Sequence, residues 1–109
     1  MNPPARLNAS EPDRWTLDGV LDFDTVGRLA VEGQVLLRTA AARGLESLVI
    51  DLAGVERANS AGLALLLEWL EMARRRGLHL SYAHLPDSLG RLAAVSSLGD
   101  LLAPAAPPI

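Results

Sequence analysis

The stretch that decides the fold is residues 51–77, which read DLAGVERANSAGLALLLEWLEMARRRG. It continues a short apolar run at residues 45–52, whose β-branched centre predicts a strand buried on one face and partly on the other. Such a strand belongs in the middle of a sheet. Residues 61–76 repeat apolar side chains at helical spacing, and the glycine that follows ends that helix. Ser60 lies just before the predicted helix, in the connection that leads to it from the strand.

Towards the amino end, residues 5–21 alternate in polarity around Glu11-Pro12-Asp13, which predicts a hairpin with its turn at residues 11–13. The pair Asp18-Gly19 is an alternative turn, because it is a good two-residue hairpin signal. That turn would leave the next two apolar residues only three positions before a helix cap. We therefore favour the first turn and expect Gly19 to be a bulge or a point of close backbone approach.

Helices and strands then alternate along the rest of the chain. Asp24 or Thr25 can cap a helix that Gly44 ends. After the helix at residues 61–76, an alternating segment at residues 78–83 predicts another strand, and Pro86 begins a last helix.

The expected order is strand, strand, helix, strand, helix, strand, helix. Since the later strands alternate with helices, they should pair in parallel through crossovers. We predict an α/β protein, a small sandwich with about four strands in a mostly parallel sheet and the helices on one face. We expect residues 1–109 to form a single domain with a structured core at about 5–102, including a short turn or helix at 98–102. Pro-rich tails occupy residues 1–4 and 103–109.

Composition excludes several classes of protein. Thirteen acidic against ten basic residues give a net charge of −3, which argues against a nucleic-acid binder. There is no cysteine, so disulfides, thiolate metal sites and thiol nucleophiles are excluded. The longest apolar stretch, residues 61–67, is far shorter than the roughly 20 residues that span a bilayer. With no secretory signal at the amino end, we expect a cytoplasmic protein.

No catalytic or metal-binding constellation is recognisable. His79 and His84 are five positions apart, which on a strand places them on opposite faces and prevents a shared metal. Asp22 and Asp24 are explained by a helix cap and a solvated loop, because no base or nucleophile accompanies them. Residues 74–76, three arginines, complement the dipole at a helix end. We therefore expect no cofactor, no metal and no enzymatic activity.

Ser60 admits two interpretations. Its hydroxyl can cap the following helix by accepting from a backbone N–H two or three positions on. Alternatively, the helix start is a recognition or modification point. A phosphate on Ser60 would add nearly two negative charges at the positive end of the helix dipole, which the fold would tolerate and a docked partner would not.

The helix at residues 61–76 carries two apolar stripes. One consists of Leu63, Leu66, Leu67 and Leu70, and the other of Leu65, Trp69 and Met72. Because one sheet contact cannot cover both, the second stripe either packs on a neighbouring helix or stays partly exposed. A partly exposed stripe of Leu, Trp and Met would be an anchor for a protein partner.

Two separated motifs resemble the signature of STAS domains. Residues 49–55 (VIDLAGV) and 59–66 (NSAGLALL) occur in the order and at the distance found in that family. Residues 17–26 fit the strand with an internal glycine that leads into the family's first helix. The resemblance covers residues 7–102 and implies a mainly parallel sheet with helices on one face.

Within that family two branches are similar to this chain. Anti-sigma-factor antagonists have an Asp-Ser-Ser/Thr-Gly motif whose first serine, at the position of Ser60, is phosphorylated by a partner kinase. MlaB-like subunits of Mla phospholipid ABC transporters have Ser/Thr-Ala-Gly-Leu-Ala-Leu-Leu, and residues 60–66 follow this pattern closely. Residues 22–26 also resemble the second branch. Asn59 departs from both branches, which usually have Asp there.

The resemblance implies a non-catalytic accessory subunit that binds the ATPase subunit of a phospholipid ABC transporter, and thereby helps to maintain outer-membrane lipid asymmetry. Such a subunit would be cytoplasmic, peripheral to the inner membrane only through the complex. The alternative is an anti-sigma-factor antagonist switched by an anti-sigma kinase at Ser60. For the transporter subunit we expect the partner-binding residues to be Asn59, Ser60, Ala61, Leu65, Trp69 and Met72.

Overall fold

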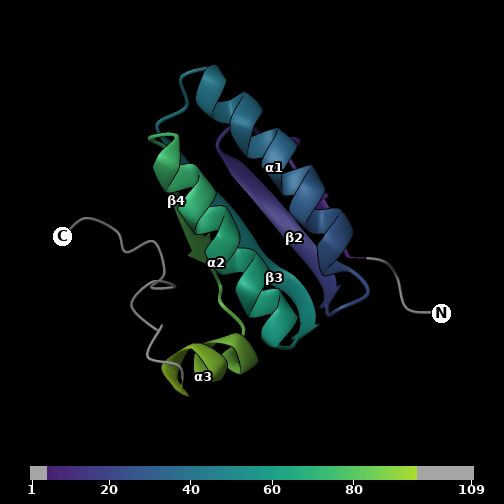
Figure 1. The fold of residues 1–109 in the computed structure, drawn as a ribbon. Helices are drawn as coiled ribbons and strands as arrows, with labels where there is room; N and C mark the ends of the chain where they lie inside the picture. Colours follow the sequence, from purple (N-terminus) through teal and green to yellow (C-terminus); the bar gives the residue numbers. More distant parts are fainter. Residues whose placement is uncertain (1–4, 96–109) are drawn as a thin grey trace.

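The computed structural model describes residues 5–95 as one open sheet covered by helices (Figure 1). Strand β1 pairs antiparallel with β2, whereas the β2–β3 and β3–β4 pairs are parallel, and the strand order is β1-β2-β3-β4. Helices α1 and α2 lie side by side over one face of the sheet. The predicted α/β class and order of elements are confirmed. In chain order the elements are β1 (Arg6–Asn8), β2 (Arg14–Leu21), α1 (Val26–Ala42), β3 (Ser47–Ala58), α2 (Ser60–Arg75), β4 (His79–Ala83) and α3 (Asp87–Val95).

The turns and helix ends lie where the sequence predicted them, and glycines mark several of these places. The hairpin turn falls between β1 and β2, at the predicted place, and the alternative turn at residues 18–19 is wrong. Gly19 has φ +97° within β2, and the register with β3 shifts on either side of it, so the predicted bulge is confirmed. Gly44 and Gly77 follow the ends of α1 and α2 with φ +87° and +73°, the left-handed conformation that glycine adopts without strain.

The central strand is longer than predicted. We expected a strand at residues 45–52, but β3 continues to Ala58. Residues 53–58 look like a loop in the sequence, yet Val55 pairs with Gly19 at the bulge of β2, and Arg57 and Ala58 pair with the last two residues of β2 beyond it. Pairing with a neighbouring strand therefore outweighs local polarity here. The segment at residues 98–102 and both Pro-rich tails lie outside the described residues.

The core lies between the sheet and the two helices that cover it. It contains no buried polar or charged residue among those described. The largest fully buried side chains are Trp69, Tyr82, Leu17, Leu21, Leu29, Leu37, Leu48, Ile50, Leu52, Leu66 and Leu89. The hydroxyl of Tyr82 donates to the carbonyl of Leu66 at 2.6 Å, which satisfies the phenol inside the core and ties β4 to α2.

Trp69 lies at the contact between α1 and α2. Its side chain is completely buried, and a Cβ atom on Gly33 of α1 would overlap the indole ring. The glycine therefore makes room for the tryptophan between the helices. Leu65, one turn earlier, is only 3% exposed. Of the two alternatives for this stripe, packing on a neighbouring helix is confirmed for Leu65 and Trp69, and partial exposure is wrong for both.

The opposite face of the sheet carries a polar cluster around Asp51. The carboxylate accepts hydrogen bonds from the Arg14 guanidinium at 3.0 Å, from the Ala53 N–H at 2.9 Å and from Nδ1 of His84 at 2.9 Å. His84 lies beyond the end of β4 with φ +56°, so the strand rule that separates it from His79 does not apply to it. Within residues 5–95 no group of three or more potential metal ligands occurs.

We expect the free energy of unfolding to decrease at acid pH, where Asp51 becomes protonated. Partial burial opposes ionisation, but the hydrogen bonds from Ala53, His84 and Arg14 outweigh it and lower the pKa of Asp51 from its usual value. A carboxyl whose folded pKa is depressed stabilises above the unfolded pKa, and that stabilisation disappears as the pH falls through the folded value. Urea denaturation between neutral pH and acid pH should therefore show a smaller acid loss in Asp51→Asn than in the wild type. Equal losses in the two proteins would contradict this role.

Candidate docking site at the start of α2

Asn59, not Ser60, caps α2. Its backbone is extended, and its side-chain oxygen accepts from the Ala61 N–H at 2.9 Å. The Asn59 N–H donates to the carbonyl of Leu21 at 3.1 Å, which fixes the cap to the end of β2. The interpretation of Ser60 as the N-cap is wrong, because an asparagine one position earlier takes that place and accepts from the first free N–H of the helix.

This capping arrangement leaves Ser60 available. Ser60 is the first residue of α2 and is exposed, and its hydroxyl makes no hydrogen bond to any residue in the described range 5–95. The first turn of α2 contains no acidic residue to offset the positive end of the helix dipole. The hydroxyl can therefore accept or donate a hydrogen bond to a partner, and the helix end would stabilise negative charge placed there.

Gly62 brings the start of α2 close to the end of β2. A Cβ atom at this position would lie 2.8 Å from Cβ of Leu21 and 3.2 Å from Cβ of Ala58. Because Leu21 is itself fully buried, neither side can give way without moving the core. The glycine therefore determines how deeply the Ser60 end of α2 sits on the sheet.

The loop between β2 and α1 holds Phe23 in solvent. Asp22 accepts from the Asp24 N–H at 2.9 Å, and the Thr25 hydroxyl donates to the carbonyl of Val20 at 2.9 Å. Thr25 is the N-cap residue of α1, but its side chain makes no capping hydrogen bond to the helix. These contacts fold the loop back on itself, and Phe23 between the two acids is 75% exposed.

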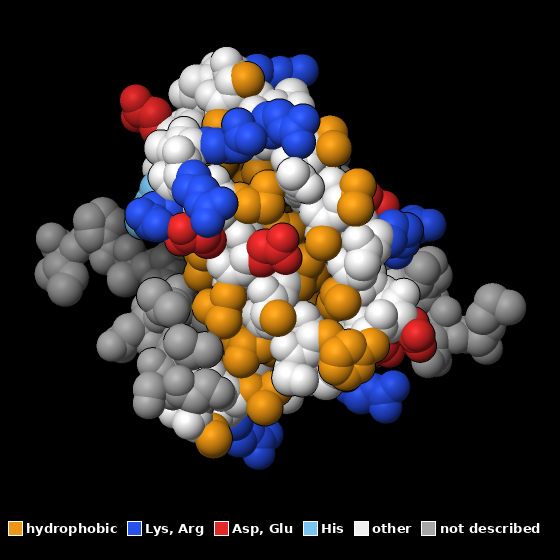
Figure 2. Space-filling view, viewed as in Figure 1, with side chains coloured by type: hydrophobic (Ala, Val, Ile, Leu, Met, Phe, Trp, Pro, Cys, Tyr) orange, Lys and Arg blue, Asp and Glu red, His pale blue; other side chains and the backbone are white. Residues whose placement is uncertain are grey.

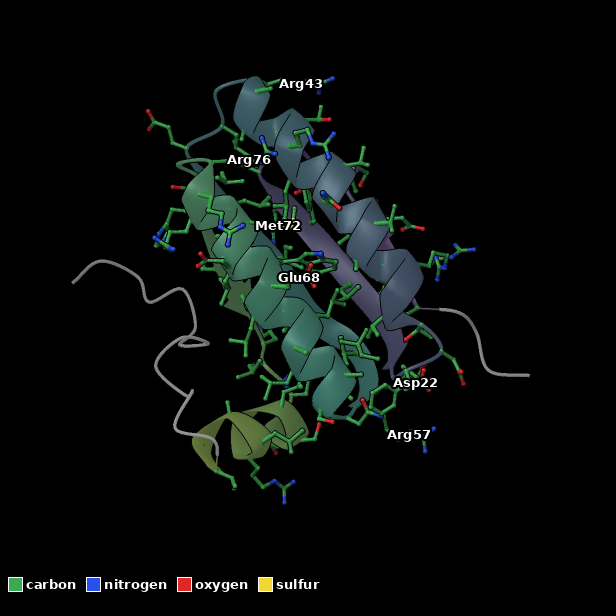
Figure 3. All side chains as sticks on the ribbon, in the orientation of Figure 1. Asp22, Arg43, Arg57, Glu68, Met72 and Arg76 are labelled. Carbon is green, nitrogen blue, oxygen red and sulfur yellow. The ribbon has the colours of Figure 1, made fainter. Side chains whose placement is uncertain are left out.

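A shallow apolar groove of about 290 Å³ lies between α1 and α2 beside Ser60. We call it the helix groove. Figure 2 shows apolar side chains along this part of the helix face, and Figure 3 shows Glu68 pointing out between the helices. The groove is lined by Phe23, Val26, Gly27, Ala30, Ala61, Ala64, Leu65 and Glu68.

The structure brings together only some of the predicted site residues. Asn59 and Ser60 are exposed at the tip of α2, and Ala61 and Leu65 contribute to the floor of the helix groove. Trp69 is buried and cannot contact a partner. Met72 is partly buried and lies between the helices towards their other end (Figure 3), so it does not belong to the same site.

Sequence reasoning missed Phe23 as a surface residue. It is the only phenylalanine in the chain, and it lies between two aspartates just before a helix cap. A large apolar residue between two solvated acids is the signal that it faces solvent rather than the core. We add Phe23 and Ala64 to the candidate docking site, which is then built from a loop and two helices.

The chain belongs to the STAS domain family. A family model described as "Mlab, STAS domain" matches residues 8–103, which is most of the chain. No curated protein sequence matches it. No helix within residues 5–95 has the length and hydropathy needed to cross a membrane.

Two of the solved structures that share this fold are forms of SpoIIAA. The unphosphorylated form of the anti-sigma factor antagonist SpoIIAA superposes with a TM-score of 0.67 at 14% identity, covering 94% of this chain and 88% of that one. The phosphorylated form of the Bacillus cell fate determinant SpoIIAA gives a TM-score of 0.63 at 15% identity, covering 94% and 91%. At these identities the similarity establishes the fold, which within residues 5–95 is a four-stranded open sheet with three helices.

Proposed function

We propose that this protein is a non-catalytic accessory subunit that docks on the ATPase of a phospholipid-transporting ABC complex. The observation that carries the proposal is the exposed Ser60 hydroxyl beside the apolar helix groove, at the positive end of α2. The family model that matches the chain is named for MlaB, and residues 60–66 follow the MlaB-like pattern. The subunit would then lie on the cytoplasmic side of the inner membrane, held there by the complex.

Two kinds of contact would hold the partner. Phe23 and the small residues of the helix groove offer an apolar surface that an aromatic or aliphatic side chain of the ATPase can cover. Ser60 adds a hydrogen bond whose geometry is fixed by the Asn59 cap. Docking regulates the ATPase only if the subunit binds its active, assembled state more tightly than the alternative state.

Pull-down with the ATPase subunit of a candidate phospholipid ABC transporter tests the proposal. We expect Ser60→Glu and Ala64→Arg each to weaken binding at least tenfold, because each places a charge that the interface would have to desolvate. Ala42→Arg is the matched control, since Ala42 is an exposed alanine at the other end of α1. Wild-type binding by both folded site variants would show that the docking surface lies elsewhere.

The second candidate function is that of an anti-sigma-factor antagonist switched by phosphorylation. The observation that favours it is the same exposed serine hydroxyl at a helix start, in a fold shared with SpoIIAA. Incubation with a candidate anti-sigma kinase and ATP, followed by intact mass measurement, distinguishes the two. A full phosphate on the wild type and none on Ser60→Ala would support the switch, whereas no transfer favours the transporter subunit.

A further inference from the structure

Half of the basic residues of this acidic protein gather at one end of the molecule. The chain has ten basic residues, all arginine, and five of them lie at the C-terminal ends of α1 and α2. Figure 2 shows these cations grouped over the helix ends, and Figure 3 labels Arg43 and Arg76 there. This end is opposite the Ser60 end of α2. We call it the arginine end; it consists of Arg38, Arg43, Arg74, Arg75 and Arg76.

Most of this charge has no partner in the part of the chain that the structure describes. Glu71 pairs with Arg74 at 2.6 Å and with Arg75 at 3.2 Å. Within residues 5–95, Arg38, Arg43 and Arg76 form no ion pair. The helix dipole accounts for cations in the last turn, but Arg38 lies before that turn of α1, and α1 has no basic residue in its last turn. Guanidinium groups without partners bind carboxylates through paired hydrogen bonds.

An apolar pocket of about 390 Å³ adjoins the arginine end, between α1 and the hairpin turn. Its floor contains the nearly buried ring of Trp15 together with Leu36, Ala40 and Leu45. Arg43 stands on its rim, and Glu11 stands on the hairpin side. Its volume lies within the range of about 300–1,000 Å³ typical of ligand sites. We call it the hairpin pocket.

We propose that the arginine end and the hairpin pocket together bind an acidic segment of another polypeptide that carries one apolar side chain. The apolar side chain occupies the hairpin pocket, and the carboxylates cross the end of α1 towards Arg43, Arg38 and Arg76. Crossing one helix covers about 10 Å, which an extended chain spans in about three residues. Glu11 repels carboxylates on the hairpin side and so orients the segment.

The charge distribution favours a short segment over other polyanions. At physiological salt electrostatic interactions are screened beyond about 8 Å. A short acidic segment bound at the arginine end is therefore attracted by the nearby arginines and is little affected by the net charge of −3 of the whole protein. Nucleic acid would extend over the acidic remainder of the surface. A membrane surface normally requires exposed large apolar residues beside the cations. Among the described residues the exposed large apolar ones are Phe23, Val31, Val35 and Val95, of which only Val35 is within one turn of a cluster arginine.

The test uses a fluorescent peptide with one leucine followed, after about three residues, by a run of glutamates. Fluorescence anisotropy at about 50 mM salt should show binding by the full chain that weakens at about 200 mM salt. Arg43→Glu and Arg76→Glu should each weaken it about tenfold. Arg91→Glu, the same charge reversal on α3, should not, and neither should Ser60→Glu, which separates this site from the proposed docking site.

The two halves of the site are tested separately. A peptide with glutamine in place of glutamate tests the charge, and one with alanine in place of leucine tests the hairpin pocket. Both should bind more weakly than the parent peptide. The proposal is overturned if the parent peptide fails to bind, if Arg76→Glu and Arg91→Glu bind it equally, or if phosphatidylglycerol vesicles bind the protein and the peptide does not.

Discussion

Gly33→Ala is expected to destabilise the protein by about 3 kcal/mol, the upper part of the range for overpacking a core. In an exposed helix the same change would stabilise by up to about 1 kcal/mol, because alanine has the better helix propensity. The sign reverses here because the added methyl group would overlap the indole ring of Trp69, whose side chain is completely buried. Denaturation in urea at neutral pH measures the difference.

Two further variants make this result specific. Gly27 is also in α1 and has no neighbouring atom where its Cβ would be, so Gly27→Ala should be neutral or stabilising. Trp69→Leu should itself be costly, but combined with Gly33→Ala it should cost less than the sum, because the smaller side chain leaves room for the methyl group. A Gly33→Ala protein as stable as the wild type, or strict additivity in the double variant, would show that the two helices are not packed through this contact.

The contact between Gly33 and Trp69 also shows why the packing of the two helices could not be predicted from the sequence. The order of the elements, the hairpin turn and the glycine-terminated helices followed from local patterns, because turns and caps depend on neighbouring residues. Whether the stripe with Leu65 and Trp69 is buried or exposed depends on which helix lies beside it. Gly33 on its own is a residue of low helix propensity, and nothing in the sequence shows that Trp69 needs the space beside it.

The candidate site, too, was predicted only as far as local sequence patterns determine it. The helix start was located correctly, but the roles of Asn59 and Ser60 could not be separated, since both residue types cap helices well. The hydrogen bond from Asn59 to Leu21 joins residues that are distant in sequence, and it decides which of the two is the cap. The place of Phe23 in the site also depends on contacts between distant parts of the chain. The groove beside it is formed by two helices, and the sequence does not show that these helices lie together.

Gly62→Ala is expected to cost about 2 kcal/mol and to weaken partner binding as well. The new methyl carbon would lie 2.8 Å from Cβ of Leu21 and 3.4 Å from its carbonyl oxygen, the same carbonyl that accepts from the Asn59 N–H. Relief requires the start of α2 to move away from β2, which weakens that hydrogen bond and shifts Ser60. Urea denaturation measures the first effect and pull-down with the ATPase measures the second.

Gly90→Ala in α3 is the matched control for Gly62→Ala. Its Cβ would lie 3.9 Å from the nearest atom, Cδ2 of Leu85, which is an ordinary contact, so helix propensity should make the change neutral or slightly stabilising. Partner binding should stay at the wild-type level in this control. If Gly62→Ala lost stability but bound the ATPase normally, the glycine would serve only packing, and the position of Ser60 would not matter for docking. Full stability together with normal binding would mean that α2 can lift from β2 without cost.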